Sequence, residues 1–136
     1  MLIIILTISC VKQKEKVSKM ILDTSNTKVE KFEVFFEKFK SDSLFQQLRI
    51  DDPLIVNTIK QDNSENVVFD KTLEKIKAVS FDPAVWGKGT YITMKSKSLD
   101  TILVDLKVEG TGIFIQHYFV LRNNLWFLYE IKDLSD

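Results

Sequence analysis

This chain of 136 residues has one cysteine, one histidine and no excess of charge of either sign. Its one cysteine excludes an intrachain disulfide, and its one histidine excludes the usual Cys/His zinc clusters. Lys and Arg number 19, and Asp and Glu also number 19, so the basic excess that displaces counterions from phosphates is missing. We therefore expect no nucleic-acid partner.

Catalytic and cofactor motifs are missing as well. No Gly-x-Ser-x-Gly nucleophile elbow is present. A phosphate loop would need Gly where Asp82 stands and Ser or Thr where Gly89 stands. A calcium loop would need Gly where Val67 stands and Glu where Leu73 stands. The sequence thus predicts no metal and no cofactor, and it favours a protein without catalytic activity.

Apolar and aromatic residues, by contrast, are plentiful. Hydrophobic residues make up 45% of the chain, which includes ten Phe, three Tyr and two Trp. A disordered tether would carry far fewer aromatic residues. Because the length leaves room for one domain, we expect a single packed core.

The first ten residues have the pattern of a secretion leader. A short apolar run over residues 2–8, far below the roughly 20 residues that span a bilayer, ends in Ser9-Cys10. The stretch from Leu6 to Cys10 resembles a bacterial lipobox, whose cysteine is lipidated and becomes the N-terminus after cleavage. The resemblance implies a lipoprotein of the bacterial cell envelope, held to the membrane by a lipid on Cys10, with its domain in the periplasm or at the cell surface. The alternative is a buried strand at 2–8 with Cys10 in the core.

Three regions follow from this interpretation. Residues 1–10 are the signal peptide ending at Cys10, residues 11–26 are a polar tether, and residues 27–136 are one α+β domain. Thr27 and Glu30 fit a capping box at the start of a helix. The apolar residues that recur there at helical spacing are Val29, Phe32, Phe35, Phe36 and Phe39. A second short helix, capped within Ser41-Asp42-Ser43 and ending before Pro53, would carry the apolar residues Leu44, Phe45 and Leu48.

Strands dominate the rest of the chain. We expect strands at 54–59, 90–97, 101–109, 112–121 and 125–132, a polar turn at 61–66, a short apolar segment at 67–69 and a helix at 71–78. Gly110-Thr111 and Asn123-Asn124 fit two-residue hairpin turns, because Gly and Asn tolerate positive φ. If both turns have two residues, Glu109 opposes Gly112 and Arg122 opposes Leu125.

This register places His117 directly opposite Glu130 on an otherwise apolar sheet face. A carboxylate beside an imidazole orients it and raises its pKa, which would suit a general base or a ligand-anchoring group. The alternative is that the two side chains only satisfy each other in the core. The pocket predicted on this face is lined by His117, Phe119, Trp126, Leu128 and Glu130.

Two N-terminal helices followed by a twisted antiparallel meander resemble the nuclear-transport-factor-two-like fold, a cystatin-like α+β cone. More narrowly, the pattern resembles an uncharacterised family of Bacteroidetes-type lipoproteins with that fold. The segments that carry the resemblance are 32–36, 44–50, 53–54, 118–119 and 126–128. The resemblance implies helices packed on a curved antiparallel sheet, and it transfers no catalytic residue, because the fold serves isomerases, dehydratases and binding modules alike.

Three functional hypotheses follow. The first is a non-catalytic module that holds a small apolar or amphipathic ligand, because a concave apolar face with few polar groups is the usual make-up of a ligand pocket. The second is an acid–base enzyme that uses His117 and Glu130. The third is a protein-interaction or homodimer-forming module that uses the opposite sheet face, with Phe114, Tyr118, Phe127 and Tyr129.

Overall fold

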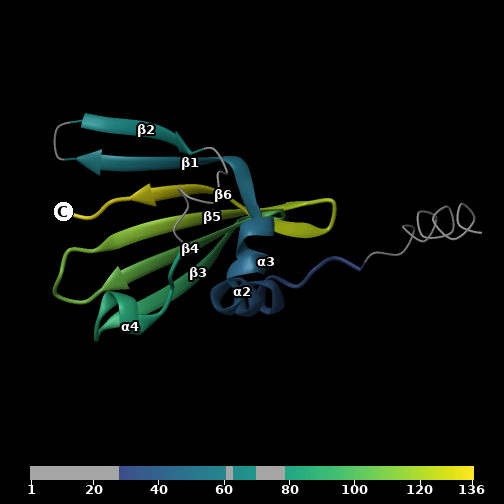
Figure 1. Ribbon diagram of the computed structural model, residues 1–136, viewed down its shortest axis with the longest axis horizontal. Helices are drawn as coiled ribbons and strands as arrows, with labels where there is room; N and C mark the ends of the chain where they lie inside the picture. The colour runs from purple at the N-terminus through teal and green to yellow at the C-terminus, as the bar shows by residue number, and fades with distance from the viewer. Residues whose placement is uncertain (1–27, 61–62, 70–78) are drawn as a thin grey trace, which may run out of the picture.

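The structure, a computed structural model, describes residues 28–60, 63–69 and 79–136. The predicted leader, the tether and the expected helix at 71–78 lie outside the described residues. One six-stranded sheet forms the body of the domain, and two helices lie across one of its faces (Figure 1). No helix in the described ranges combines the length and apolar character needed to cross a membrane.

The sheet is mixed. Its strands are β1 (Ile50–Lys60), β2 (Asn63–Phe69), β3 (Thr90–Ser98), β4 (Thr101–Val108), β5 (Phe114–Arg122) and β6 (Leu125–Asp133), in the order β2-β1-β6-β5-β4-β3. The four C-terminal strands form the predicted antiparallel meander. The pairing of β1 with β6 is parallel, which the sequence did not predict. β2 begins within the expected polar turn and pairs along β1.

The first described helix, α2 (Phe32–Ser41), buries the predicted phenylalanines Phe32, Phe35, Phe36 and Phe39. Its predicted start is wrong. The helix begins at Phe32 with Lys31 at the N-cap, whose side chain makes no capping bond, and Val29 is 52% exposed. Glu30 is recruited elsewhere, because its carboxylate accepts hydrogen bonds from Arg49 and from the Trp126 amide.

The second helix, α3 (Ser43–Leu48), is capped by Asp42 as predicted, since the Asp42 carboxylate accepts from the Phe45 amide at 2.9 Å. Of its three apolar residues, Phe45 packs partly buried against the core, whereas Leu44 and Leu48 are 71% and 75% exposed. Gln46 is the buried residue. It donates to the Phe39 and Val79 carbonyls and accepts from the Val79 amide, so it ties α3 to both neighbouring segments.

A third short helix, α4 (Pro83–Trp86), lies in a region for which the sequence predicted neither a helix nor a strand. The Asp82 carboxylate accepts from the Ala84 amide, and proline stands in the first turn, where its missing N–H costs nothing. The Trp86 indole donates to the Ser80 carbonyl at 2.7 Å. These contacts hold α4 beside the start of β3, at the end of the sheet far from α2 (Figure 1).

Both hairpin registers begin as predicted. Leu106 pairs with Ile115 across β4 and β5, which is the pairing expected from the Gly110 turn. Arg122 pairs with Leu125 across β5 and β6. Asn123 and Asn124 have φ values of 50° and 65°, the left-handed conformation that a two-residue type I′ turn requires.

A β-bulge then interrupts the second hairpin. Phe119 pairs with Leu128, but the next pair is Tyr118 with Glu130, so Tyr129 is the extra residue. The faces of β6 exchange beyond this point. Glu130 therefore lies on the face of Tyr118, opposite to the face predicted for it, and Ile131 packs against the core.

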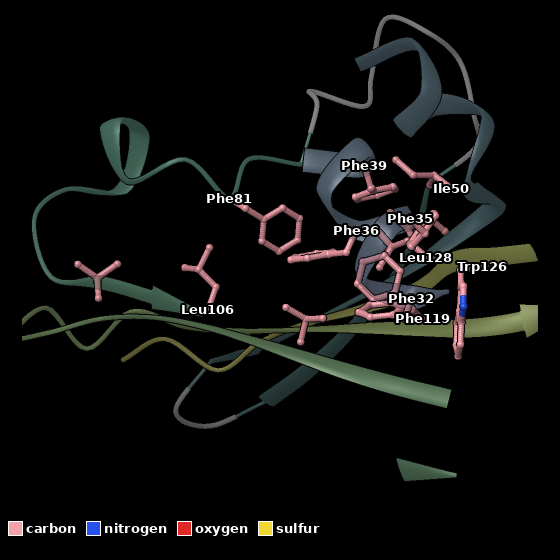
Figure 2. Packing of buried hydrophobic residues seen from close by; sticks show 13 residues of the cluster. Phe32, Phe35, Phe36, Phe39, Ile50, Phe81, Leu106, Phe119, Trp126 and Leu128 are labelled. Atoms are coloured by element: carbon pink, nitrogen blue, oxygen red, sulfur yellow. The ribbon is translucent and has the colours of Figure 1, made fainter. Parts of the chain in front are cut away.

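The core lies between α2 and the sheet and is built mainly of aromatic rings (Figure 2). Phe119 from β5 contacts the rings of all four inward phenylalanines of α2, with centroids 5.3–5.9 Å apart. Phe36 and Phe39 also contact Phe81, which precedes α4. Because a fully buried Phe contributes roughly 1.5–3 kcal/mol, this cluster accounts for much of the stability of the fold.

Candidate functional site

His117 occupies the middle of β5 on the core side of the sheet and is 3% exposed. Its ring lies against Phe81, with centroids 4.6 Å apart. The Nδ1 atom is buried and has no hydrogen-bond partner, and it is the single buried side-chain nitrogen or oxygen in the described residues for which this holds. Polar atoms in such a position are rare in folded proteins and call for an explanation.

Burial also sets the protonation state of His117. Removal from water lowers the pKa of His117 from 6.5 to about 4, against smaller opposing contributions from a backbone hydrogen bond with Val104 and from the charge of Asp105. The imidazole is therefore neutral at pH 7. A neutral ring carries one N–H and one acceptor nitrogen, so it can hold a ligand without a charge.

Glu130 does not accompany His117, and the predicted pair is wrong. The bulge at Tyr129 puts Glu130 on the opposite face, where its carboxylate accepts from the Asn57 amide group at 2.7 Å. Lys132 Nζ lies 3.5 Å from the same carboxylate. His117 pairs instead with Ile131, and in the part of the chain that the structure describes no carboxylate is paired with the imidazole.

Three further predicted pocket residues, Phe119, Trp126 and Leu128, are at most 5% exposed and belong to the core cluster. The rings of α2 cover Phe119, and Phe32 lies across Trp126 with ring centroids 5.1 Å apart. The core side of the sheet is therefore filled at the α2 end. Among the predicted pocket residues on this face, His117 lies farther along the sheet, with its ring beside Phe81.

The outer face of the sheet carries a polar network that the sequence analysis missed. Asp105 is 2% exposed, and its carboxylate accepts from Lys95 Nζ at 2.9 Å and from the Gln116 amide at 3.0 Å. The Tyr118 hydroxyl donates to Gln116 in turn. An aspartate in the centre of the apolar segment 101–108 was the available signal, since a buried carboxylate needs partners on neighbouring strands.

Cationic side chains cover the aromatic rings of this outer face. Lys107 Nζ lies 4.2 Å from the Phe114 ring centroid, and Lys132 Nζ lies 4.7 Å from that of Tyr118. Arg49 lies 5.5 Å from that of Phe127. Tyr129 packs beside Tyr118, and partial burial raises the pKa of its hydroxyl. Such cation–π contacts shield aromatic rings from water without a protein partner.

Ligands for a metal do not come together either. The described residues contain no group of three or more His, Cys, Asp or Glu side chains placed to hold an ion. Cys10 lies outside the described residues, so the lipidation site stays a prediction.

Comparison with solved structures defines the class of the fold. The chain has the nuclear-transport-factor-two-like (NTF2-like) α+β fold, also described as cystatin-like, in which helices pack on a curved sheet. This confirms the predicted fold class. No protein-family model matches the sequence, and no curated protein matches it.

The particular relatives come from Bacteroides. An NTF2-like protein of Bacteroides fragilis has a TM-score of 0.59 and 25% identity over 82% of this chain, which spans 50% of that protein. A cystatin-like protein of Bacteroides caccae has a TM-score of 0.52 and 18% identity, covering 78% of this chain and 77% of that one. A Bacteroides uniformis protein gives 0.51 and 18%, covering 82% and 80%. These likenesses establish the fold and leave function to the site.

Proposed function

We propose that this protein is a lipid-anchored envelope protein whose domain binds a small amphipathic ligand without catalysis, at His117. The observation that carries the proposal is the buried Nδ1 atom of His117, which has no partner among the described residues. An unsatisfied buried polar group costs about 1–3 kcal/mol. A ligand that supplies one hydrogen bond there would recover that free energy.

The neutral imidazole defines the chemistry of the ligand. The backbone hydrogen bond with Val104 raises the pKa of His117, which is the effect of a carbonyl that accepts the ring N–H. A neutral imidazole has one N–H and one acceptor nitrogen, so Nδ1 offers a ligand one uncharged hydrogen bond. A hydroxyl group can satisfy either tautomer, because it both donates and accepts, and the rest of the matching ligand is apolar, since Phe81 lies against the ring.

Acid–base catalysis is disfavoured by the same geometry. Its proposed carboxylate, Glu130, lies on the other face of the sheet. With a pKa of about 4, His117 is a weak base, and no described carboxylate is paired with its ring to help it accept a proton.

Native mass spectrometry with matched aliphatic probes tests ligand binding. We expect protein purified from a Gram-negative periplasm to bind dodecanol, which donates a hydrogen bond, more tightly than dodecane or laurate. The His117→Phe variant should lose the preference for dodecanol, whereas Glu130→Gln should keep it. Equal retention of the three probes by the unmodified protein would contradict a hydrogen-bonding role for His117.

The envelope location is part of the proposal and depends on the leader. We expect radiolabelled palmitate to be incorporated at Cys10 and the protein to fractionate with membranes. Cys10→Ala should abolish both. Unlabelled protein that still fractionates with membranes would point to a different anchor.

A homodimer through Phe114, Tyr118, Phe127 and Tyr129 is the remaining alternative. Three of these rings are covered by Lys107, Lys132 and Arg49, so a partner would have to displace those cations. Analytical ultracentrifugation separates the two cases, since a monomer at micromolar concentration favours the binding module and a dimer favours the interface.

A further inference from the structure

One end of the sheet gathers exposed apolar side chains. Of the ten large apolar residues that are exposed in the described ranges, three stand at this end, namely Val29 before α2, Leu99 in the β3–β4 turn and Leu125 at the first position of β6, with exposed fractions of 52%, 101% and 40%. Three more, Val34, Leu44 and Leu48, belong to the helices that cover the same half of the sheet (Figure 1). A concentration of this kind on one part of a small domain marks a contact surface.

Hydrogen bonds hold the three loops next to one another. The Leu121 amide donates to the Asp100 carbonyl at 2.7 Å, which joins the β3–β4 turn to the end of β5. The Glu30 amide donates to the Asn124 carbonyl at 3.0 Å, which joins the segment before α2 to the β5–β6 turn. The three apolar side chains therefore stand on connected, rigid supports rather than on independent loops.

The position of this end relative to the rest of the chain identifies its partner. The described chain enters the domain here, at Lys28, so this end is the one joined to the segment that contains Cys10. The opposite end carries α4, the Gly110 turn and Asp136, whose amide donates to the Gly112 carbonyl. If Cys10 carries the proposed lipid, the end with Leu99 and Leu125 is the part of the domain nearest the bilayer.

The charges at this end are largely balanced. Arg122 pairs with Asp51 at 2.6 Å, and Arg49 pairs with Glu30 at 2.8 Å. Other charged side chains of this end are the three cations Lys28, Lys31 and Lys97 and the two carboxylates Glu33 and Asp100. A surface with so little net charge, but with protruding aliphatic side chains, fits a zwitterionic lipid surface better than a highly charged partner.

We propose that this end is a membrane-contacting surface, and the inference rests on the lipid anchor proposed above. Val29, Leu99 and Leu125 enter the headgroup region of the bilayer, to a depth of about 5–10 Å as for other interfacial apolar groups. A single lipid anchor limits the distance of a domain from the membrane but leaves its orientation free. These three contacts hold the domain upright, with α4 and the β4–β5 turn facing away from the bilayer.

Depth-dependent fluorescence quenching tests the orientation. The intact lipidated protein is placed in vesicles of phosphatidylethanolamine and phosphatidylglycerol that contain a spin-labelled lipid. An environment-sensitive fluorophore is attached at Leu99→Cys, at Leu125→Cys or at the control position Val85→Cys, which is 65% exposed in α4 at the opposite end. We expect at least about threefold stronger quenching at the first two positions, unchanged by 1 M salt. Equal quenching at the three positions overturns the proposal, and so does quenching that 1 M salt abolishes.

A second arm separates this inference from the anchor. The Cys10→Ser chain, which has no lipid, should still partition weakly into the same vesicles. Since removing one inserted aliphatic side chain weakens partitioning by about tenfold, Leu99→Asp should lower it by at least that factor and Val85→Asp should not. Missing palmitate labelling with this pattern intact refutes the anchor alone, whereas equal effects of Leu99→Asp and Val85→Asp refute the membrane-contacting surface alone.

Discussion

Arg49 and Glu30 form a two-pronged ion pair that closes the domain at the point where the chain enters it. Arg49 Nη1 and Nη2 donate to the two carboxylate oxygens of Glu30, at 2.8 and 3.2 Å. The Trp126 amide donates to the same carboxylate, and the Trp126 indole donates to the Glu30 carbonyl. One glutamate thus connects the segment before α2, the end of α3 and the β5–β6 hairpin.

Neutralising this glutamate should destabilise the protein. In Glu30→Gln the charge of Arg49 loses its partner, and both side chains are mostly buried, at 13% and 20% exposed for Arg49 and Glu30. We expect a loss of about 2 kcal/mol in the free energy of unfolding, measured by urea denaturation. Glu37→Gln is the matched control, because Glu37 pairs with Lys40 at the surface and should cost under about 0.5 kcal/mol. Equal costs would mean that the buried pair contributes no more than a surface pair.

The helical region shows which parts of the fold could be predicted from the sequence. The stripe of phenylalanines in α2 depends on spacing alone, and its burial was predicted correctly. The start of α2 and the facing of α3 depend on partners distant in sequence. Glu30 binds Arg49 and Trp126 instead of capping the helix, and the polar Gln46 is the buried residue of α3 while Leu44 and Leu48 are exposed. Helical spacing cannot reveal such partners.

Gln46 should accordingly be intolerant of an apolar replacement. Gln46→Leu keeps the size of the side chain but leaves the Val79 amide, and the carbonyls of Phe39 and Val79, without their present partner. An orphaned buried backbone group costs about 1–3 kcal/mol, so we expect a loss within or above that range by urea denaturation. The neighbouring Gln47→Leu, with no described bond of this kind, should change stability by less than about 0.5 kcal/mol. A neutral Gln46→Leu would show that water replaces the amide.

In the sheet, too, features that depend on the local sequence pattern were predicted, and features that depend on distant residues were not. Alternation and turn residues predicted strands β3–β6, the register of β4 with β5, and the first half of the register of β5 with β6. The bulge at Tyr129 was not predicted, although a signal existed. Apolar residues on the core face follow one another at Trp126 and Leu128 and then at Ile131, so the spacing changes from two to three where the bulge occurs. The shift also suits the parallel pairing with β1, because it places the Glu130 carboxylate where the Asn57 amide group donates to it.

Removing the extra residue should therefore be tolerated. Deleting Tyr129 joins Leu128 to Glu130 and leaves the pairs on both sides of the bulge in register. We expect a folded protein that loses no more than about 2 kcal/mol, since the ring contact with Tyr118 is lost while the β5–β6 pairs are kept. Deleting Phe127 instead forces Trp126 or Leu128 out of the core, which costs about 2–5 kcal/mol. Circular dichroism with urea denaturation distinguishes the two, and equal damage would mean that Tyr129 is itself needed for the fold.

His117 should make stability depend on pH in a defined window. Its folded-state pKa of about 4 lies below the ordinary value of 6.5, so the unfolded chain takes up the proton first as the pH falls. The neutral, folded form is favoured above pH 6.5, and this stabilisation is lost progressively between pH 6.5 and about 4. A difference of this size corresponds to about 3 kcal/mol at most.

Because the chain has one histidine, His117→Phe isolates the effect, while the carboxylates titrate alike in both proteins. Urea midpoints measured from pH 7 to pH 4.5 should fall more steeply for the unmodified protein than for His117→Phe. Parallel curves would mean that the imidazole reaches water when it is protonated, which would also remove the basis for an uncharged hydrogen-bonding group in the proposed ligand site.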